Sequence, residues 1–67
     1  MLKWLKGIRK AKGFTQSEVA RRSFVTQAAY CNIENGERAP SVSTAKKIAE
    51  VLDFDWTMFF SDQQDTA

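Results

Sequence analysis

Apolar residues recur along this chain at intervals of three and four, and nowhere do they alternate with polar residues over a useful length. Intervals of three and four place side chains on one face of an α-helix, whereas alternation is typical of a β-strand. The clearest apolar stripe consists of Val42, Ala45, Ile48, Ala49 and Leu52. The pattern therefore predicts an all-α protein built from short helices.

Two helix starts lie close together near the middle of the chain. Thr15 begins a capping box, Thr-x-x-Glu, that Glu18 closes, and Thr26 is the N-cap candidate of the next helix. We predict helices over about residues 15–22 and about residues 26–35. Two short helices joined by a tight turn are typical of a helix-turn-helix.

The other helix boundaries follow from residues that tolerate special backbone conformations or cap a helix. Gly13 ends a first helix that carries Leu2, Leu5 and Ile8, and the pair Asn35-Gly36 supplies a left-handed C-cap for the third helix. Ser41 caps the fourth helix directly after Pro40. Asp53 can end that helix in the left-handed conformation. Asp55 can cap a fifth helix over residues 56–60.

Length and composition limit what this chain can be. Its 67 residues allow one domain with one small core, over residues 1–60, and we expect residues 61–67 to be a polar, disordered tail. A single cysteine cannot form an internal disulfide, which fits a reducing compartment. No apolar run approaches the roughly 18 residues needed to span a bilayer, and no signal peptide is recognisable. We therefore expect a cytoplasmic protein with no membrane partner.

The charges are unevenly distributed along the chain. Residues 1–22 contain seven basic residues and one acidic residue, a net charge of +6, whereas residues 23–67 contain three basic and seven acidic residues, a net charge of −4. A basic half beside an acidic half suits a protein that docks one face on phosphates. The alternative is that the lysines only solvate the first helix, so this asymmetry is weak evidence by itself.

The third predicted helix has an unusual polar face. At about 100° per residue, five of its residues fall within an arc of roughly 140°. We call these five residues the polar arc: Gln27, Ala28, Cys31, Asn32 and Asn35. Glutamine and asparagine can pair with adenine in the major groove, and alanine can contact a thymine methyl group. An ordinary solvated face would carry lysine and glutamate, so the arc favours a DNA-recognition helix.

Several of these residues resemble the Cro/C1-type helix-turn-helix of phage repressors, also called the XRE family. The resemblance covers about residues 2–60, and its most specific parts are the Thr-Gln that opens the second helix and the Glu-Asn-Gly that closes the third. The residues that carry it are Gln16, Ala20, Val25, Thr26, Gln27, Ile33, Glu34, Asn35, Gly36 and Pro40. The family fold that this resemblance implies is a compact bundle of five helices, with the third in the major groove.

The resemblance also implies roles for individual residues. Those expected to read bases lie on the third helix and at its N-cap: Thr26, Gln27, Ala28, Cys31 and Asn32. Those expected to contact phosphates are Gln16, Asn35 and, in the following loop, Arg38. Arg9 and Glu34 match a partly buried ion pair that ties the first helix to the end of the third.

Three residues depart from the family pattern. Phe24 occupies a turn position that usually holds glycine, often with positive φ, so either the backbone is strained there or the turn is built differently. Ser23 replaces an apolar residue, and Tyr30 replaces a smaller aliphatic one. We expect Phe24 and Tyr30 to fill the space that Ser23 leaves.

The aromatic residues have two interpretations, base stacking or burial. Stacking modules are mostly β-sheets, so we expect core or dimer contacts instead for Trp4, Phe14, Phe54, Trp56, Phe59 and Phe60. A five-residue terminal helix cannot bury all of its large apolar side chains against one small domain, and exposed apolar surface marks a partner site. The candidates for a dimer interface are therefore Trp56, Met58, Phe59 and Phe60.

Residue counts exclude several kinds of chemistry. The chain contains no histidine and only one cysteine, so a Cys/His metal site and Cys/His catalysis are both excluded. A chain of this length offers no architecture for a catalytic pocket, so we expect neither an enzyme nor a cofactor, and no small-molecule ligand. Cys31 lies on the polar arc, where a redox-sensitive thiol is the alternative to a base contact.

Two function classes remain. The favoured one is a sequence-specific regulator of transcription that binds double-stranded DNA, most often a repressor, as a homodimer on a near-palindromic operator. The alternative is a protein-interaction module with the same fold, such as the antitoxin of a toxin–antitoxin pair. The acid-free polar arc favours the first class, whereas a long disordered C-terminal arm would favour the second.

Overall fold

A computed structural model describes residues 2–60 of the chain, and over this range it is entirely helical. Four helices are complete: α1 (Lys3–Ala11), α2 (Gln16–Arg22), α3 (Gln27–Glu34) and α4 (Val42–Leu52). A fifth helix begins at residue 58 and is described as far as residue 60. The predicted all-α fold of five helices is confirmed, with no strand among the described residues. The predicted disordered tail, residues 61–67, lies outside them.

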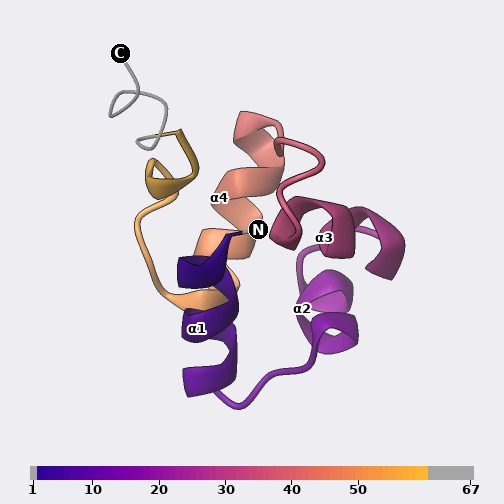
Figure 1. Cartoon of the computed structure of the whole chain (residues 1–67), viewed down its shortest axis with the longest axis vertical. Helices are drawn as coiled ribbons and strands as arrows, with labels where there is room; N and C mark the ends of the chain where they lie inside the picture. Colours follow the sequence, from indigo (N-terminus) through magenta and orange to yellow (C-terminus); the bar gives the residue numbers. More distant parts are fainter. Residues whose placement is uncertain (1, 61–67) are drawn as a thin grey trace.

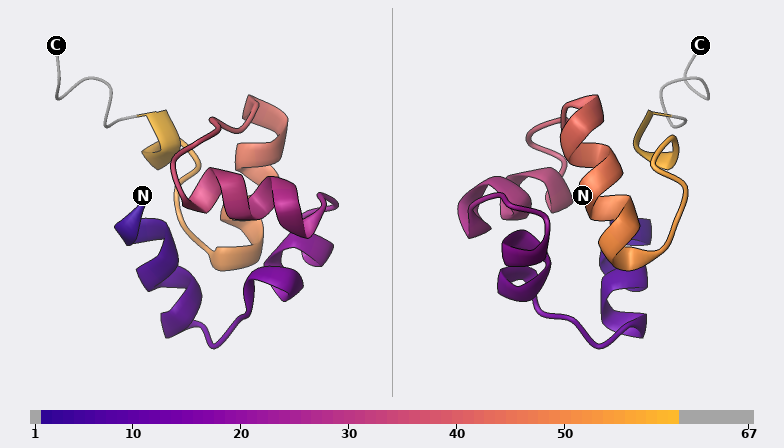
Figure 2. Two further views of the ribbon diagram at one scale, coloured as in Figure 1. Left: turned by 45° about the vertical axis from the view of Figure 1, so that its right-hand side comes forward. Right: turned by 180° about the vertical axis from the view of Figure 1, so that it is seen from behind.

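The helices surround one small core (Figures 1 and 2). α2 and α3 pack against each other as the helix-turn-helix, α4 packs against α2, and α1 contacts α3. The view from behind shows α4 crossing the back of the bundle, with the segment after it returning toward the N-terminus. This arrangement leaves one side of α3 uncovered, and that side carries the polar arc.

Hydroxyl side chains begin three of the helices, as the sequence predicts. The Oγ1 atom of Thr15 accepts a hydrogen bond from the Glu18 backbone N–H at 3.1 Å, and Thr26 accepts one from the Ala29 N–H at 3.1 Å. Ser41 accepts one from the N–H of Thr44 at 3.2 Å. Each bond satisfies a backbone donor that has no partner inside its helix. The starts of α2, α3 and α4 are therefore determined by residues within one turn of each helix N-terminus.

Only one of the two hydrogen bonds of a capping box is found at the start of α2, the bond from the Glu18 backbone N–H to Thr15 Oγ1. The Glu18 carboxylate accepts a hydrogen bond from Arg22 Nη2 at 3.3 Å, one turn along the same helix. The C-caps follow the predictions: Gly36 has φ +81° after α3, and Asp53 has φ +61° after α4. Asp55 caps the final turn through its Oδ1 atom, which accepts from the Thr57 backbone N–H at 3.0 Å.

The core combines aliphatic residues of the four helices with an aromatic cluster. Trp4 packs edge-to-face on Phe54 and Phe59, with ring centroids 5.4 and 5.2 Å apart. Such edge contacts are preferred by aromatic rings and add to the free energy of burial. The buried apolar residues are Leu5, Val19, Ala20, Tyr30, Ile33, Ala45, Ile48, Ala49, Leu52 and Phe59.

The structure distinguishes apolar residues that the sequence pattern treats alike. Val42, the first member of the apolar stripe of α4, is 49% exposed, because the stripe extends one turn beyond the core. Phe59, for which core or dimer contacts were expected, is a core residue, because it turns toward Trp4 and Phe54. The half-buried candidates in this segment are Trp56, Met58 and Phe60.

The turn between α2 and α3 keeps the backbone of a glycine turn although it holds an aromatic residue. Phe24 has φ +61°, in the left-handed region, and its side chain is 81% exposed. The prediction that Phe24 fills the space beside Ser23 is therefore wrong: the ring lies in solvent, with Lys47 Nζ 5.6 Å from its centroid. Tyr30 is fully buried, as the same prediction requires.

Ser23, just before Phe24, is fully buried, and its hydroxyl has no hydrogen-bond partner among the described residues. A buried polar group without a partner costs about 1–3 kcal/mol. We expect Ser23→Ala to raise the free energy of unfolding by about 1 kcal/mol, measured by urea denaturation.

The matched control is Ser43→Ala, which removes an exposed hydroxyl from α4. Its free energy of unfolding should stay within about 0.5 kcal/mol of that of the parent protein, which is the difference in helix propensity between serine and alanine. A lower stability of Ser23→Ala would show that the hydroxyl has a bonding partner, such as a buried water molecule.

Candidate nucleic-acid interface

The polar arc of α3 lies on the outer side of the helix-turn-helix. In the left view of Figure 2, α3 runs across the front of the molecule with α4 behind it. Gln27 and Ala28 are exposed, whereas Cys31, Asn32 and Asn35 are half-buried. The opposite side of α3 faces the core, and it carries Tyr30, Ile33 and Glu34. The predicted division of α3 into an inner and an outer side therefore matches the burial of its residues.

The outer side chains differ in how firmly they are held. Thr26 uses Oγ1 as the cap of α3, so its hydroxyl is already oriented and retains its proton for donation. Asn35 Nδ2 donates to the Sγ atom of Cys31 at 3.5 Å, which links two members of the arc along one helical turn. Gln27 has no side-chain partner among residues 2–60. Among residues 2–60, the arc therefore offers two amides without a side-chain partner, those of Gln27 and Asn32, beside the linked pair Cys31 and Asn35.

A buried ion pair lies at the end of α3. Arg9 donates from Nε to Glu34 Oε2 at 2.9 Å and from Nη2 to Oε1 at 3.2 Å. The Glu34 side chain is 1% exposed and that of Arg9 is 9% exposed. Arg9 Nη1 also donates to the carbonyl oxygen of Phe14 at 2.8 Å. One guanidinium thus connects α1, the end of α3 and the loop before α2, as the predicted ion pair requires.

The environment of this pair shifts the pKa values of its members. Burial by itself raises the pKa of the Glu34 carboxyl, but hydrogen bonds from Arg9 and Gln16 lower it below its ordinary value. The hydrogen bond to Glu34 raises the pKa of Arg9. Burial, and then the neighbouring carboxylate, raise the pKa of the Tyr30 hydroxyl above its usual range. The pair is therefore charged at neutral pH, beside a neutral tyrosine.

Gln16, a predicted phosphate contact, is half-buried at the first position of α2. Its Nε2 atom donates to Glu34 Oε1 at 2.9 Å. This bond was not predicted, because no local sequence signal joins residues 18 positions apart. The structure thus brings Gln16 to the end of α3, next to the polar arc.

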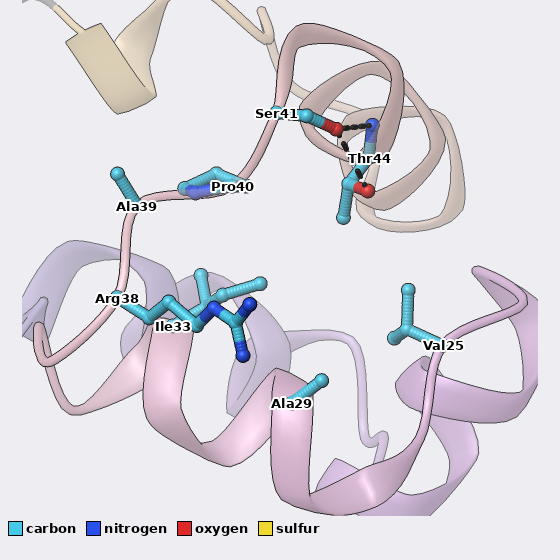
Figure 3. Close-up of a pocket in the computed structure, with 8 residues that line it drawn as sticks. All are labelled: Val25, Ala29, Ile33, Arg38, Ala39, Pro40, Ser41 and Thr44. Carbon is cyan, nitrogen blue, oxygen red and sulfur yellow. Dashed lines mark hydrogen bonds between the residues drawn. The ribbon is translucent and has the colours of Figure 1, made fainter.

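Arg38, the third predicted phosphate contact, lies in the loop between α3 and α4. Its side chain is exposed, lines the same groove as Ile33 and makes no ion pair with a described residue (Figure 3). It borders a groove of about 420 Å³ between α3 and the start of α4. The groove is lined by Val25, Ala29, Ile33, Arg38, Ala39, Pro40, Ser41 and Thr44. The loop therefore presents an unpaired positive charge beside the helix-turn-helix.

Some surface cations have local partners and others have none. Lys12 pairs with Asp53 at 3.7 Å, and Lys46 lies over the Trp56 ring at 5.2 Å. Within the described part of the chain, the exposed cations without such a partner include Lys3, Lys10, Arg21 and Arg38. Three of these four belong to the basic first part of the sequence.

Other kinds of site have little support in the described residues. No group of three or more histidine, cysteine, aspartate or glutamate residues within 2–60 is arranged to hold a metal ion. None of the helices in that range is long and apolar enough to cross a membrane.

Comparison with known proteins shows the family to which this chain belongs. Residues 5–59 match the model of a family described as helix-turn-helix. The chain belongs to this helix-turn-helix family. The predicted resemblance to the Cro/C1-type group is confirmed, and with it membership in a family of DNA-binding regulators of transcription.

Two individual proteins illustrate the relationship. The chain is 58% identical over 62 residues to an uncharacterized HTH-type transcriptional regulator, YqaF, of Bacillus subtilis (strain 168), and the match covers 92% of this chain and 82% of YqaF. A solved complex of the SinR and SinI proteins matches with a TM-score of 0.80 and 28% identity. That match covers all of this chain and 67% of the solved one.

The buried pair of this helix-turn-helix protein can be tested by removing one partner. Arg9→Met leaves the Glu34 carboxylate buried without its cation, and we expect the free energy of unfolding to fall by about 3–5 kcal/mol. Thermal unfolding followed by circular dichroism measures the change.

Arg22→Met is the matched control, because it removes an arginine from the exposed pair with Glu18. An exposed pair contributes about 0–1 kcal/mol, so this variant should stay close to the parent protein. An unchanged midpoint of thermal unfolding for Arg9→Met would mean that the ion pair does not stabilise the fold.

Proposed function

We propose that this protein is a transcriptional repressor that binds a specific operator in double-stranded DNA by inserting α3 into the major groove. The observation that carries the proposal is the polar arc, an outward-facing surface with three amides, small side chains and no acid. A carboxylate at this position would repel the phosphates that border the groove. Helix-turn-helix proteins dock in this way, with the preceding helix across the DNA backbone.

The chemistry of the arc assigns its members to base edges. Gln27 and Asn32 pair with adenine, which offers an acceptor at N7 and a donor at N6. Ala28 contacts the methyl group of thymine. Thr26, the N-cap of α3, and Cys31, within the arc, complete the set that reads bases.

Phosphate contacts fix the position of the protein on the duplex. The residues proposed for these contacts are Gln16 on α2, Asn35 at the end of the polar arc, and Arg38 in the loop that follows α3. Such contacts carry little sequence information, but they set the register and much of the affinity. Arg38 supports this assignment most simply, because its charge is exposed and unpaired among the described residues.

A single recognition helix reads only a few base pairs, so we propose that two copies bind together. A two-fold symmetric dimer places its two recognition helices about 34–36 Å apart, one turn of B-DNA, on a near-palindromic operator. The surface proposed for the pairing is formed by Trp56, Met58 and Phe60. Trp56 and Phe60 are half-buried and stack edge-to-face at 6.0 Å, which gives a compact aromatic surface.

Base reading is tested by selecting bound sites from random DNA and then measuring the affinity of variants for the selected site. We expect Gln27→Ala to weaken the binding free energy at the selected site by about 1–3 kcal/mol and to relax the base preference at one position of that site. Gln16→Ala, the matched control, should weaken selected and random DNA about equally.

Equal losses on both kinds of DNA for Gln27→Ala would contradict its role as a base reader. A parent protein that selects no sequence would favour the alternative, a protein-interaction module with the same fold.

The dimer is tested by placing a charge in its proposed surface. Phe60→Glu should abolish self-association and cooperative operator binding, because a buried carboxylate without a partner is costly. Sedimentation measures association, and circular dichroism shows whether the variant is folded.

Val42→Glu is the matched control for association, since it places the same charge on an exposed apolar residue at the start of α4. A folded Phe60→Glu protein with undiminished cooperativity would place the interface elsewhere.

A further inference from the structure

We propose that the Arg9–Glu34 pair has a second task besides stabilising the fold: it holds the carboxamide of Gln16 in position for a DNA phosphate. This proposal rests on the proposed function, in which Gln16 contacts the DNA backbone. Arg9 and Glu34 are then positioning residues, which act on DNA through Gln16.

The geometry of the cluster supports this role. Glu34 Oε1 accepts two hydrogen bonds, from Arg9 Nη2 at 3.2 Å and from Gln16 Nε2 at 2.9 Å. Glu34 Oε2 is held by Arg9 Nε at 2.9 Å. Because both carboxylate oxygens are occupied and the side chain is buried, the acceptor that Gln16 uses is fixed in space.

The placement of Glu34 brings Gln16 to the edge of the DNA-facing surface. On α3, at 100° per residue, Glu34 lies about 60° around the helix from Cys31, which precedes it by less than one turn. The carboxamide that Glu34 anchors comes from α2 and is only half-buried. Gln16 is thus fixed to the buried ion pair at the end of α3 that also carries Cys31 and Asn35 of the polar arc.

The chemistry of the anchored carboxamide fits a phosphate. One N–H of Nε2 is used by Glu34, so the second N–H remains for an anionic oxygen. A lone carboxylate behind Gln16 would repel that anion, but the Arg9 guanidinium neutralises it. The cluster therefore presents an oriented donor with no net negative charge.

Anchoring also lowers the entropic cost of the contact. A free glutamine loses rotamer freedom when it binds, whereas Gln16 has already lost most of it on folding. From the usual cost of immobilising such a side chain, we expect anchoring to improve DNA affinity by roughly two- to tenfold. Because the contact is to the backbone, this gain should be equal on selected and random DNA.

The experiment replaces the whole pair, because removing only one partner leaves a buried charge. Arg9→Met/Glu34→Leu substitutes apolar side chains for a buried ion pair, a change that folded proteins often tolerate. This double variant, Gln16→Ala and the triple variant are measured in the full chain against the selected site and random duplex.

We expect the double variant to lose roughly two- to tenfold in affinity on both DNAs, and Gln16→Ala to lose at least as much. The triple variant should bind no more weakly than Gln16→Ala, because the pair acts only through Gln16. A double variant that binds like the parent, or losses that multiply in the triple variant, would overturn the proposal.

A second measurement needs no variant of the pair. In NMR spectra of the parent protein, the Gln16 side-chain amide should be rigid and slow to exchange with water, and its free proton should shift when DNA is added. The amide of exposed Gln27 is the matched control, because it lacks a partner among the described residues. A Gln16 amide as mobile as that of Gln27 would refute the anchoring directly. A parent protein that binds no DNA would instead refute the proposed function.

Discussion

The burial of one carboxylate constrains most of this structure. Glu34 faces the core side of α3, where an isolated charge is far less stable than in water, and it is tolerated because Arg9 and Gln16 donate three hydrogen bonds to it. These donors come from α1 and α2. The backbone carbonyl of Glu34 also accepts from the Leu2 N–H at 2.8 Å. A change in the position of α3 would therefore break contacts to α1, to α2 and to the N-terminal segment at once.

This constraint matters because α3 has to serve as both core and surface. A helix of eight residues has little more than two turns, so it buries Tyr30 and Ile33 on one side and presents the polar arc on the other. Its inner contacts set the direction in which the arc faces. The same helix therefore joins the stability of the bundle to the geometry of the surface proposed to read DNA.

The turn between α2 and α3 shows how a small fold accommodates an unfavourable residue. Phe24 adopts a positive φ, which is costly for a residue with a Cβ atom, and its ring gains little burial in return. Ser23 beside it is buried, and its hydroxyl has no hydrogen-bond partner within residues 2–60. The packing of α2 on α3 and on α4 evidently outweighs both costs, since the turn keeps the conformation that joins the two helices.

The sequence by itself determined the features that depend on near neighbours along the chain. Helix bounds follow from caps such as Thr15, Thr26 and Ser41, and left-handed ends follow from Gly36 and Asp53, because these residues act within one turn. The two sides of α3 follow from its periodicity.

Tertiary structure alone decided which apolar residues reach the core and which polar groups meet. Phe59 is buried and Val42 is not, because burial depends on where α4 and the final turn cross the bundle. The bond from Gln16 to Glu34 joins residues far apart in sequence, and the ring of Phe24 points to solvent because α2 and α3 fix its backbone. The physical reason is range: capping and periodicity act over three or four residues, whereas packing and burial depend on the whole chain.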